Sequence, residues 1–343
     1  MQANLRPHLT NCTNFSQFQS AYRQGHCTET TLLDVLNNVY TSADEKQVTV
    51  LIGLDLSAAF DTVCHQTLLQ RLQSEFGVSG TALSWIWSYL TDRKQFIKLG
   101  LRNSPETKLE VGIPQGSVLG PLLFTVYCSP AADVIVSHGV RHHQHADDTQ
   151  LHLAKRANNI AAGLSTLATC TSDVKLWFMQ NDLQLNPDKS EALMMGTANQ
   201  LQSASSLTLV KVAGVDLPEA DDIKVLGVLL DWRVAFDKQV SAMARSCNYH
   251  AQAIHHIRHL LTMDLAQTLA CSLILSRIDY CNAVLHGAPS GTIHKLQRVQ
   301  NNAARIVHQA PRRSHAYALL KKLHWLPVEQ HISYKLALLT FKI

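Results

Sequence analysis

The alternation of hydrophobic and polar positions predicts a mixture of strands and helices in the first two thirds of the chain. Residues 47–54 form an unbroken β-branched and apolar run that ends on Asp55. This is typical of a strand buried on both faces, with an acidic residue exposed at its carboxyl end. Helical periodicity then runs over 61–76 and stops at Gly77. The next predicted elements are a helix over 81–90 and short strands near 96–99 and 108–111.

Pro114 and Gly116 predict a loop, after which 117–137 is predicted to be one buried helix. Its apolar part, 118–136, is the most membrane-like stretch of the chain. A buried helix is nevertheless a better interpretation than a membrane span. The residues that interrupt the stretch are Gly120, Pro121, Pro130 and Asp133.

The residues around Ala146 predict a hairpin of strand, tight turn and strand, with 149–153 as its second arm. A long helix is predicted over 158–183, closed by a turn at Asn186-Pro187-Asp188. Further strands are expected at about 192–195, 207–212 and 225–230. From Ala235 onward the pattern is almost wholly helical.

Charge divides the chain of 343 residues at the point where this helical pattern begins. From Arg233 to the end there are 14 Lys and Arg residues and 4 Asp and Glu residues, a net charge of +10. The first 232 residues contain 16 Lys and Arg residues and 22 Asp and Glu residues, a net charge of −6. An acidic part followed by a basic helical part is expected if the second part grips a polyanion. The alternative is an ordinary solvated basic surface.

The eight cysteines show neither a CxxC pair nor zinc-finger spacing, which indicates reduced thiols in an intracellular protein, nuclear or cytoplasmic. The N-terminus lacks the apolar core of a signal peptide. Histidines cluster at His142, His143 and His145, and His255 and His259 have helical spacing. Without paired cysteines or an acidic third ligand, structural zinc is disfavoured.

Three aspartates stand in two separate motifs: Asp55 in Leu-Asp-Leu-Ser-Ala-Ala-Phe-Asp, and the pair Asp147 and Asp148 in His-Ala-Asp-Asp. A site that joins nucleotides needs carboxylates from separate segments that converge on two divalent cations. An aspartate at a strand end and two at a hairpin turn would supply them. The alternative is turn and cap chemistry, in which aspartate is common.

These motifs, in this order, resemble the reverse transcriptase of LINE-type, non-LTR retrotransposons of the jockey-like kind. Residues 55–61 resemble motif A, 113–120 (Ile-Pro-Gln-Gly-Ser-Val-Leu-Gly) motif B, 146–150 motif C, 186–191 motif D and 225–228 the primer grip. Residues 18–26 resemble the second fingers motif, and 278–282, 296–305 and 323–328 resemble thumb and post-thumb signatures. The resemblance covers almost the whole chain.

The resemblance implies an α+β right-hand polymerase fold, with an antiparallel palm sheet flanked by helices and an all-helical thumb. The implied domains are partial fingers at 1–46, a palm at 47–232 and a basic thumb and post-thumb region at 233–343. The implied activity is RNA-directed DNA polymerase: transfer from a dNTP to a DNA 3′-hydroxyl on an RNA template. Two Mg²⁺ ions, or Mn²⁺ in their place, would bind Asp55, Asp147 and Asp148.

The resemblance also assigns residues to the nucleotide. Phe60 resembles the steric gate that excludes a 2′-hydroxyl and so favours dNTP substrates; its alternative is a core aromatic. Gln115 and Gly116 would contact the incoming nucleotide, where the alternative is a simple turn. Lys189 would protonate or stabilise the departing pyrophosphate, unless it is a solvent-facing lysine. Arg23 would bind the triphosphate.

The remaining assignments concern nucleic acid and helix ends. Asp61 is expected to be a helix-start residue favoured by the helix dipole. Basic side chains of the C-terminal part would hold the backbone of the duplex without reading its sequence. They are Arg298, Arg305, Arg312, Arg313, Lys321 and Lys322. The expected partners are an RNA template, a DNA primer and a dNTP, with no membrane.

Two departures from the family pattern leave an alternative function open. His145 stands where the family carries Tyr or Phe before Ala-Asp-Asp. The first fingers motif and an endonuclease are expected to be missing from the chain, which would then be truncated at the fingers. The alternative is a weak or inactive retrotransposon remnant that binds RNA or RNA–DNA hybrid. An RNA polymerase or maturase relative is disfavoured by Phe60 and the thumb motifs.

Overall fold

The computed structural model describes residues 2–204, 209–218 and 220–342 and divides the chain into two compact units. The first unit contains Met1–Cys27 and Ser42–Ala220, and the second contains Thr28–Thr41 and Asp221–Ile343. These boundaries differ from those predicted at 46/47 and 232/233. The difference arises because most of α2 (Thr28–Asp44) and the residues from 221 onward group with the C-terminal helices. The names fingers, palm and thumb stay predictions.

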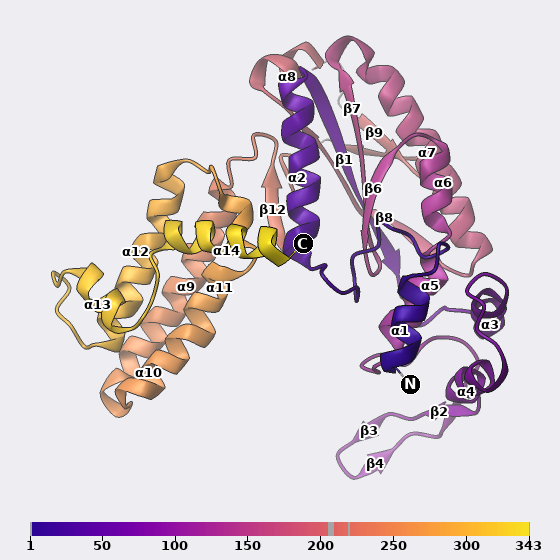
Figure 1. The fold of residues 1–343 in the computed structure, drawn as a ribbon, viewed down its shortest axis with the longest axis horizontal. Coiled ribbons are helices and arrows are strands. Elements are labelled where there is room, and N and C mark those ends of the chain that lie inside the picture. Colours follow the sequence, from indigo (N-terminus) through magenta and orange to yellow (C-terminus); the bar gives the residue numbers. More distant parts are fainter. Residues whose placement is uncertain (1, 205–208, 219, 343) are drawn as a thin grey trace. The chain divides into compact units, whose positions relative to one another are not determined.

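A four-stranded antiparallel sheet in the order β6-β7-β1-β8 forms the centre of the first unit (Figure 1). Its strands are β1 (Gln47–Ser57), β6 (Arg141–His145), β7 (Asp148–Arg156) and β8 (Gln184–Met195). Strand β1 is mostly buried, as its apolar run predicts. It continues past the predicted end at 54 to Ser57, so Asp55 lies inside the strand.

Helices pack around this sheet and share one hydrophobic core with it. Helix α7 packs against β7, β8 and β9, and α6 packs against α7 and β6. The helices of the first unit are α1 (Gln2–Thr10), α3 (His65–Ser74), α4 (Gly80–Leu90), α5 (Gly120–Cys128), α6 (Ala131–Ser137), the 3₁₀ turn η1 (Ala157–Asn159), α7 (Ile160–Gln180) and α8 (Ala198–Ala204).

The helix predicted over 117–137 is two helices, α5 and α6, and they meet at Ser129 and Pro130. Pro130 has no amide proton for a bond to the carbonyl one turn earlier, so it begins a new helix. Gly120–Ser137 is the one stretch of the described residues with the length and composition to cross a membrane, and 67% of it is buried in the structure.

The turn predicted at Asn186-Pro187-Asp188 is wrong, because β8 runs through these residues without a break. Gly53 pairs with Glu191 and Asp55 pairs with Asn186, so the register shifts between them. Residues 187–190 therefore form a bulge opposite Leu54, which accommodates a proline that cannot donate to the ladder.

Three short hairpins complete the first unit. The strand predictions near 96–99 and 108–111 fall within two of them, shifted by a few residues. For the strand predicted over 207–212, residues 207 and 208 lie outside the described part. The pairs are β2 (Arg93–Gln95) with β5 (Thr107–Leu109), β3 (Lys98–Leu99) with β4 (Arg102–Asn103), and β9 (Leu209–Val212) with β10 (Val215–Pro218).

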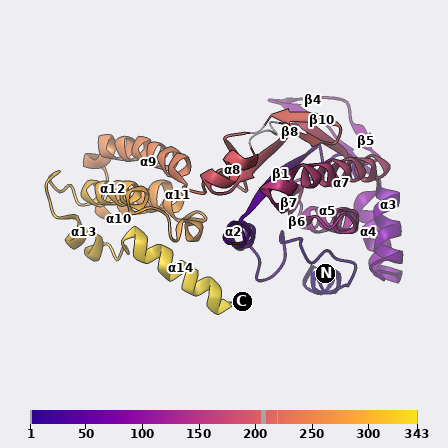
Figure 2. The same ribbon diagram turned by 90° about the horizontal axis from the view of Figure 1, so that it is seen from above.

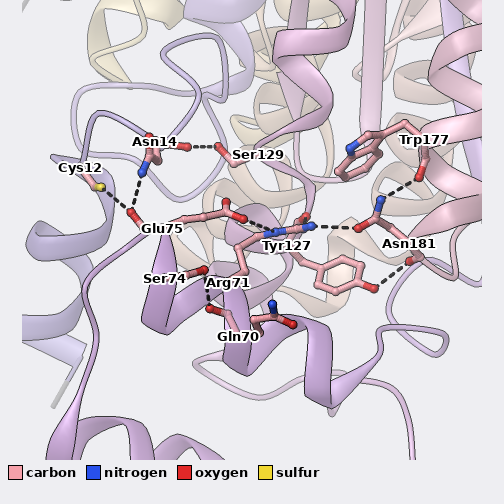
Figure 3. Close-up of polar contacts among 10 residues, drawn as sticks. All are labelled: Cys12, Asn14, Gln70, Arg71, Ser74, Glu75, Tyr127, Ser129, Trp177 and Asn181. Atoms are coloured by element: carbon pink, nitrogen blue, oxygen red, sulfur yellow. Dashed lines mark hydrogen bonds and ion pairs between the residues drawn. The ribbon is translucent and has the colours of Figure 1, made fainter.

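A buried arginine joins α3 to the end of α5 (Figure 3). The Arg71 guanidinium donates to the Tyr127 carbonyl and, at 2.8 Å, to Oδ1 of Asn181, and it lies 3.4 Å from the Glu75 carboxylate. The Tyr127 hydroxyl donates to the Asn181 carbonyl at 2.7 Å. These contacts satisfy a buried charge and fix the position of α5.

The second unit is helical apart from one hairpin, β11 (Asp222–Val225) with β12 (Val228–Asp231). The single strand predicted over 225–230 is therefore wrong. Leu226 and Gly227 both have positive φ, 47° and 82°, and form the two-residue turn that joins the strands.

Helices α9, α10 and α12 pack together in this unit (Figures 1 and 2). The elements after the hairpin are α9 (Asp237–Ile257), η2 (Arg258–Leu260), α10 (Met263–Ala270), the π-helical turn η3 (Cys271–Leu275), α11 (Ser276–Asp279), η4 (Asn282–Leu285), α12 (Ser290–Val307), α13 (Ala316–Lys322) and α14 (Val328–Lys342).

Candidate active site

Pairing of β1 with β7 brings the acidic residues of two distant motifs together. Leu54 pairs with Thr149, so Asp55 and Asp148 are the next residues along two neighbouring antiparallel strands. Asp148 begins β7, and Asp147 lies in the turn directly before it. The structure therefore gathers the three aspartates at one end of this strand pair.

The carboxylates influence one another electrostatically. Burial, followed by the negative charges of Asp147 and Asp55, raises the pKa of Asp148 to about 6. A raised pKa means that the ionised form is disfavoured unless a positive charge arrives. The site therefore carries more negative charge than the surrounding side chains neutralise.

Asp55 is the aspartate with an identified cationic neighbour. Its Oδ2 is buried and accepts no hydrogen bond from the described residues. Lys189 Nζ lies 3.9 Å from this oxygen, on a side chain that is 70% exposed. Because exposed ion pairs are weak, the ammonium group can be displaced by a stronger cation. Lys189, on the bulged part of β8, thus lies beside Asp55.

These carboxylates fit a divalent cation that takes only part of its ligands from the protein. Across residues 2–204, 209–218 and 220–342, no three or more His, Cys, Asp and Glu side chains form a ready metal cage. Mg²⁺ commonly binds through one or two carboxylates together with substrate phosphates and water. The unpartnered oxygen of Asp55 and the raised pKa of Asp148 fit that mode of binding.

The loop of residues 113–120, which resembles motif B and is called the motif B loop below, lies against the segment that follows Asp55. Gln115 Nε2 donates to Oδ1 of Asp61 at 3.0 Å. Gly112 has φ +88°, and a Cβ there would lie 2.8 Å from the Asp61 carbonyl oxygen. The expectation that Asp61 starts a helix is wrong, since α3 begins only at His65. Asp61 instead anchors an exposed glutamine of the loop.

The rest of this loop is closed by its own serine. Ser117 Oγ donates to the Pro114 carbonyl at 2.7 Å and accepts the amide of Gly120 at 3.0 Å. Gly116 is exposed and has φ +76° with open space around it. Gln115 and Gly116 therefore present accessible backbone and amide groups at the tip of the loop.

Phe60 is a partly buried aromatic at the edge of the core. Its ring stacks on Phe124 of α5, with centroids 4.5 Å apart and an interplanar angle of 26°. Its carbonyl accepts the amide of Ile113 at 2.8 Å. One face of the ring is thus packed, while the residue keeps some exposure beside the motif B loop.

His145 pairs with Asp148 across the hairpin. Burial lowers the pKa of the His145 imidazole, and the nearby His143 lowers it further, while Asp147 partly opposes this. The imidazole is therefore neutral at physiological pH and keeps a ring of aromatic shape at this position.

The recorded contacts of Arg23 are with other residues than the three aspartates. Its guanidinium donates to the Gln17 carbonyl at 3.1 Å. The side chain lines a hollow of about 970 Å³ with Glu75, Ser129 and Asp133, and the lining includes none of the three aspartates. The role of Arg23 in binding a triphosphate stays a prediction.

The basic residues of the helical unit surround two shallow hollows. Arg305 lines both of them, a hollow of about 530 Å³ shared with Arg312 and a hollow of about 680 Å³ shared with Arg313. Arg298, Lys321 and Lys322 are exposed on α12 and α13. These side chains are accessible to a polyanion.

Two residues near the aspartates were not singled out by sequence reasoning. Tyr22 has a pKa raised by burial and by the charge of Asp147, which puts its ring near that carboxylate. Gln19 is buried and hydrogen bonds to Ala146. Both belong to the segment that resembles a fingers motif, which was the available signal.

Residues 1–230 match the family described as reverse transcriptase (RNA-dependent DNA polymerase). This is more than half of the chain, and the chain therefore belongs to the reverse transcriptase family. The predicted resemblance to non-LTR retrotransposon enzymes and the α+β polymerase fold are confirmed.

Three proteins of Drosophila melanogaster are similar to this chain in sequence. The probable RNA-directed DNA polymerase from transposon BS is 28% identical, over 92% of this chain and 35% of its own length. The corresponding protein of transposon X-element is 27% identical, over 85% and 32%. The RNA-directed DNA polymerase from mobile element jockey is 24% identical, over 86% and 32%. The chain thus spans about a third of the length of these relatives.

Among solved structures, apo telomerase from Candida tropicalis truncated from its C-terminal domain is similar with a TM-score of 0.48 and 10% identity. The match covers 67% of this chain and 43% of that chain.

Proposed function

We propose that this chain carries the polymerising centre of an RNA-directed DNA polymerase. The observation that supports this most directly is that Asp55 of β1, Asp148 of β7 and Asp147 of the turn before β7 converge, with the pKa of Asp148 raised by burial and by the other two. The substrate would be a dNTP, added to a DNA 3′-hydroxyl on an RNA template. Family membership supports the same reaction.

Asp55, Asp147 and Asp148 would hold two divalent cations, with Mg²⁺ as the expected metal. When bound, these ions activate the attacking hydroxyl and stabilise the departing pyrophosphate. Lys189, which lies beside Asp55, is free to turn toward the pyrophosphate and supply a proton or positive charge.

Phe60 and Gln115 would select and orient the nucleotide. The Phe60 ring stacks on Phe124, and this contact would hold it in place against a 2′-hydroxyl. Gln115 is held by Asp61 beside the exposed Gly116, where a nucleotide can approach the backbone closely. The exposed basic residues of the helical unit would bind phosphates of the template–primer duplex without reading its sequence.

Single-nucleotide incorporation on a primed RNA template tests the proposal. Wild-type protein should add one dNMP in the presence of Mg²⁺ or Mn²⁺, and Asp147→Asn should add none, because an amide cannot replace a carboxylate as ligand and charge. Asp133→Asn, an exposed acid on α6, is the matched control and should retain activity.

His145→Tyr restores the aromatic residue that the family carries at this position. Incorporation by wild type no greater than by Asp147→Asn, in protein shown to be folded by circular dichroism, would contradict the proposal. Activity in His145→Tyr alone would place the defect at His145 and leave the carboxylate site intact.

A further inference from the structure

The turn that carries Asp147 contains a strained residue. Ala146 has φ 60°, in the left-handed region that a residue with a Cβ adopts only at a cost of about 1 kcal/mol or more. Such a conformation persists where surrounding contacts fix it. The contacts of Ala146 therefore determine where the Asp147 carboxylate points.

The side-chain amide of Gln19 hydrogen bonds to both the backbone N–H and the backbone carbonyl of Ala146. The amide of Ala146 donates to Gln19 Oε1 at 3.0 Å, and Gln19 Nε2 donates to the Ala146 carbonyl at 3.3 Å. Gln19 Oε1 also accepts the amide of Ala21 at 3.0 Å. Gln19 is 1% exposed, so water cannot replace these bonds.

The segment that presents Gln19 is itself fixed to β6. The amide of Gln144 donates to the Phe18 carbonyl and the amide of Ser20 donates to the Gln144 carbonyl, both at 2.9 Å, which makes a parallel bridge. Ser20 Oγ lies 2.6 Å from Nε2 of His143. Gln19 is thus a rigid support that reaches the turn from outside the hairpin.

We infer that Gln19 is a positioning residue for the metal-binding carboxylates: it holds Ala146 in the left-handed conformation and thereby orients Asp147 and Asp148. This rests on the proposed function for its consequence in catalysis. Gln19 acts through Ala146 and makes no contact with the nucleotide in this role. Supporting groups of this kind typically change metal affinity about 10- to 100-fold when they are removed.

Amide hydrogen exchange in wild-type protein is the first test, because it needs no variant and no activity. The Ala146 amide should exchange as slowly as the neighbouring amides of β7. Fast exchange of the Ala146 amide, as in an open turn, would overturn the inference.

Substitution provides the second test. Gln19→Leu keeps the bulk of the side chain but removes both hydrogen bonds to Ala146 and the one that Gln19 accepts from the Ala21 amide. Gln17→Leu makes the same change of side chain at an exposed position of the same segment. We expect Gln19→Leu to speed Ala146 exchange about tenfold and to weaken binding of Mn²⁺, measured by electron paramagnetic resonance, about tenfold. Gln17→Leu should change neither. Equal behaviour of the two variants would overturn the inference.

Gln19→Glu distinguishes positioning from simple packing. A buried carboxyl has a raised pKa, and only its protonated form can donate to the Ala146 carbonyl while accepting the Ala146 amide. The exchange rate of the Ala146 amide in this variant, divided by the rate in wild type at the same pH, should be well above 1 at pH 8. The ratio should approach 1 near pH 5.5. A ratio that does not change with pH would contradict positioning by this pair of bonds.

These measurements separate the inference from the proposed function. If wild type adds no nucleotide yet Mn²⁺ binding and Ala146 exchange respond to Gln19→Leu, the positioning role holds and the polymerase proposal fails. If wild type is active, and nucleotide incorporation by Gln19→Leu depends on Mn²⁺ concentration in the same way as incorporation by wild type, the positioning role fails and the polymerase proposal holds.

Discussion

The ammonium group of Lys189 lies 3.9 Å from Oδ2 of Asp55, an oxygen that is buried and accepts no hydrogen bond from the described residues. The two residues come from β8 and β1, and a register shift between Gly53 and Asp55 produces the bulge that contains Lys189. The lysine therefore compensates charge at the carboxylate site when no metal is bound. Under the proposed function, its ammonium group would turn to the departing pyrophosphate once a metal replaces it at Asp55.

Replacement of this lysine should have opposite effects on binding and on turnover. Lys189→Met removes a cation that competes for Asp55, so Mn²⁺ should bind about two- to fivefold more tightly in the absence of nucleotide, the range expected of an exposed ion pair. Incorporation should slow because the leaving group loses its partner. Lys211→Met is the matched control, since Lys211 forms an exposed ion pair with Asp216 at 3.6 Å. Weaker Mn²⁺ binding in Lys189→Met would contradict this role.

Asp148 should make the metal-free protein less stable as pH rises. Its pKa lies near 6 in the folded chain, above the ordinary value of 3.8, so between these values the folded state binds more protons than the unfolded state. The protonated form is present at low pH, and stability is lost as pH rises from about 4 to 6. The loss should be about 1 to 2 kcal/mol, less than the full shift implies, because the carboxyl is partly solvated.

Urea unfolding at pH 5 and pH 7.5, without divalent metal, checks this expectation. Asp148→Asn should be more stable than wild type at pH 7.5 and should show a smaller change between the two pH values. Addition of Mn²⁺ should reduce the difference between wild type and Asp148→Asn. If wild type instead became more stable relative to Asp148→Asn as pH rises, the predicted effect of the raised pKa of Asp148 on stability would be contradicted.

Gly112, directly before the segment that resembles motif B, and Gly116, within it, offer a matched test of close approach. Gly112→Ala combines φ +88° with a Cβ that meets the Asp61 carbonyl at 2.8 Å, and should cost about 2 to 3 kcal/mol of unfolding free energy. Gly116→Ala has φ +76° but open space, and should cost only about 1 kcal/mol. Chemical denaturation measures both. Equal costs would show that the contact with Asp61 is not tight.

Phe60 should decide which sugar is accepted. In Phe60→Val the ring that stacks on Phe124 is lost, and the preference for dNTP over rNTP should fall about 10- to 100-fold. Competition between the two nucleotides in the incorporation assay measures the ratio. Phe96→Val changes a phenylalanine that is 50% exposed and should leave the ratio unchanged. An active Phe60→Val enzyme with wild-type sugar preference would refute the gate.

The parts of the fold that the sequence predicts well are those with a strong local signal. Strand β1 follows from an uninterrupted apolar run, and the β6–β7 hairpin from two arms around Ala146. The charge change coincides with the helical C-terminal part. These signals depend on neighbours in the chain, so no knowledge of the tertiary structure is needed.

The parts that were wrong or missed depend on partners far apart in the sequence. The bulge in β8 arises from the register with β1, which local turn chemistry at Asn186-Pro187-Asp188 does not encode. Asp61 faces Gln115, 54 residues later, and Gln19 holds Ala146, 127 residues later. A side chain that bonds to a distant backbone group leaves no periodic pattern in the sequence. Arg71, paired with Asn181, was missed for the same reason.

Anomalous diffraction from crystals of the protein with Mn²⁺, a primed RNA template and a non-hydrolysable dNTP would locate the bound metal. If these carboxylates form the polymerising centre, manganese should be bound by carboxylate oxygens of Asp55 and of the Asp147–Asp148 pair. Manganese only at the histidines of β6, or none near these three aspartates, would contradict this expectation.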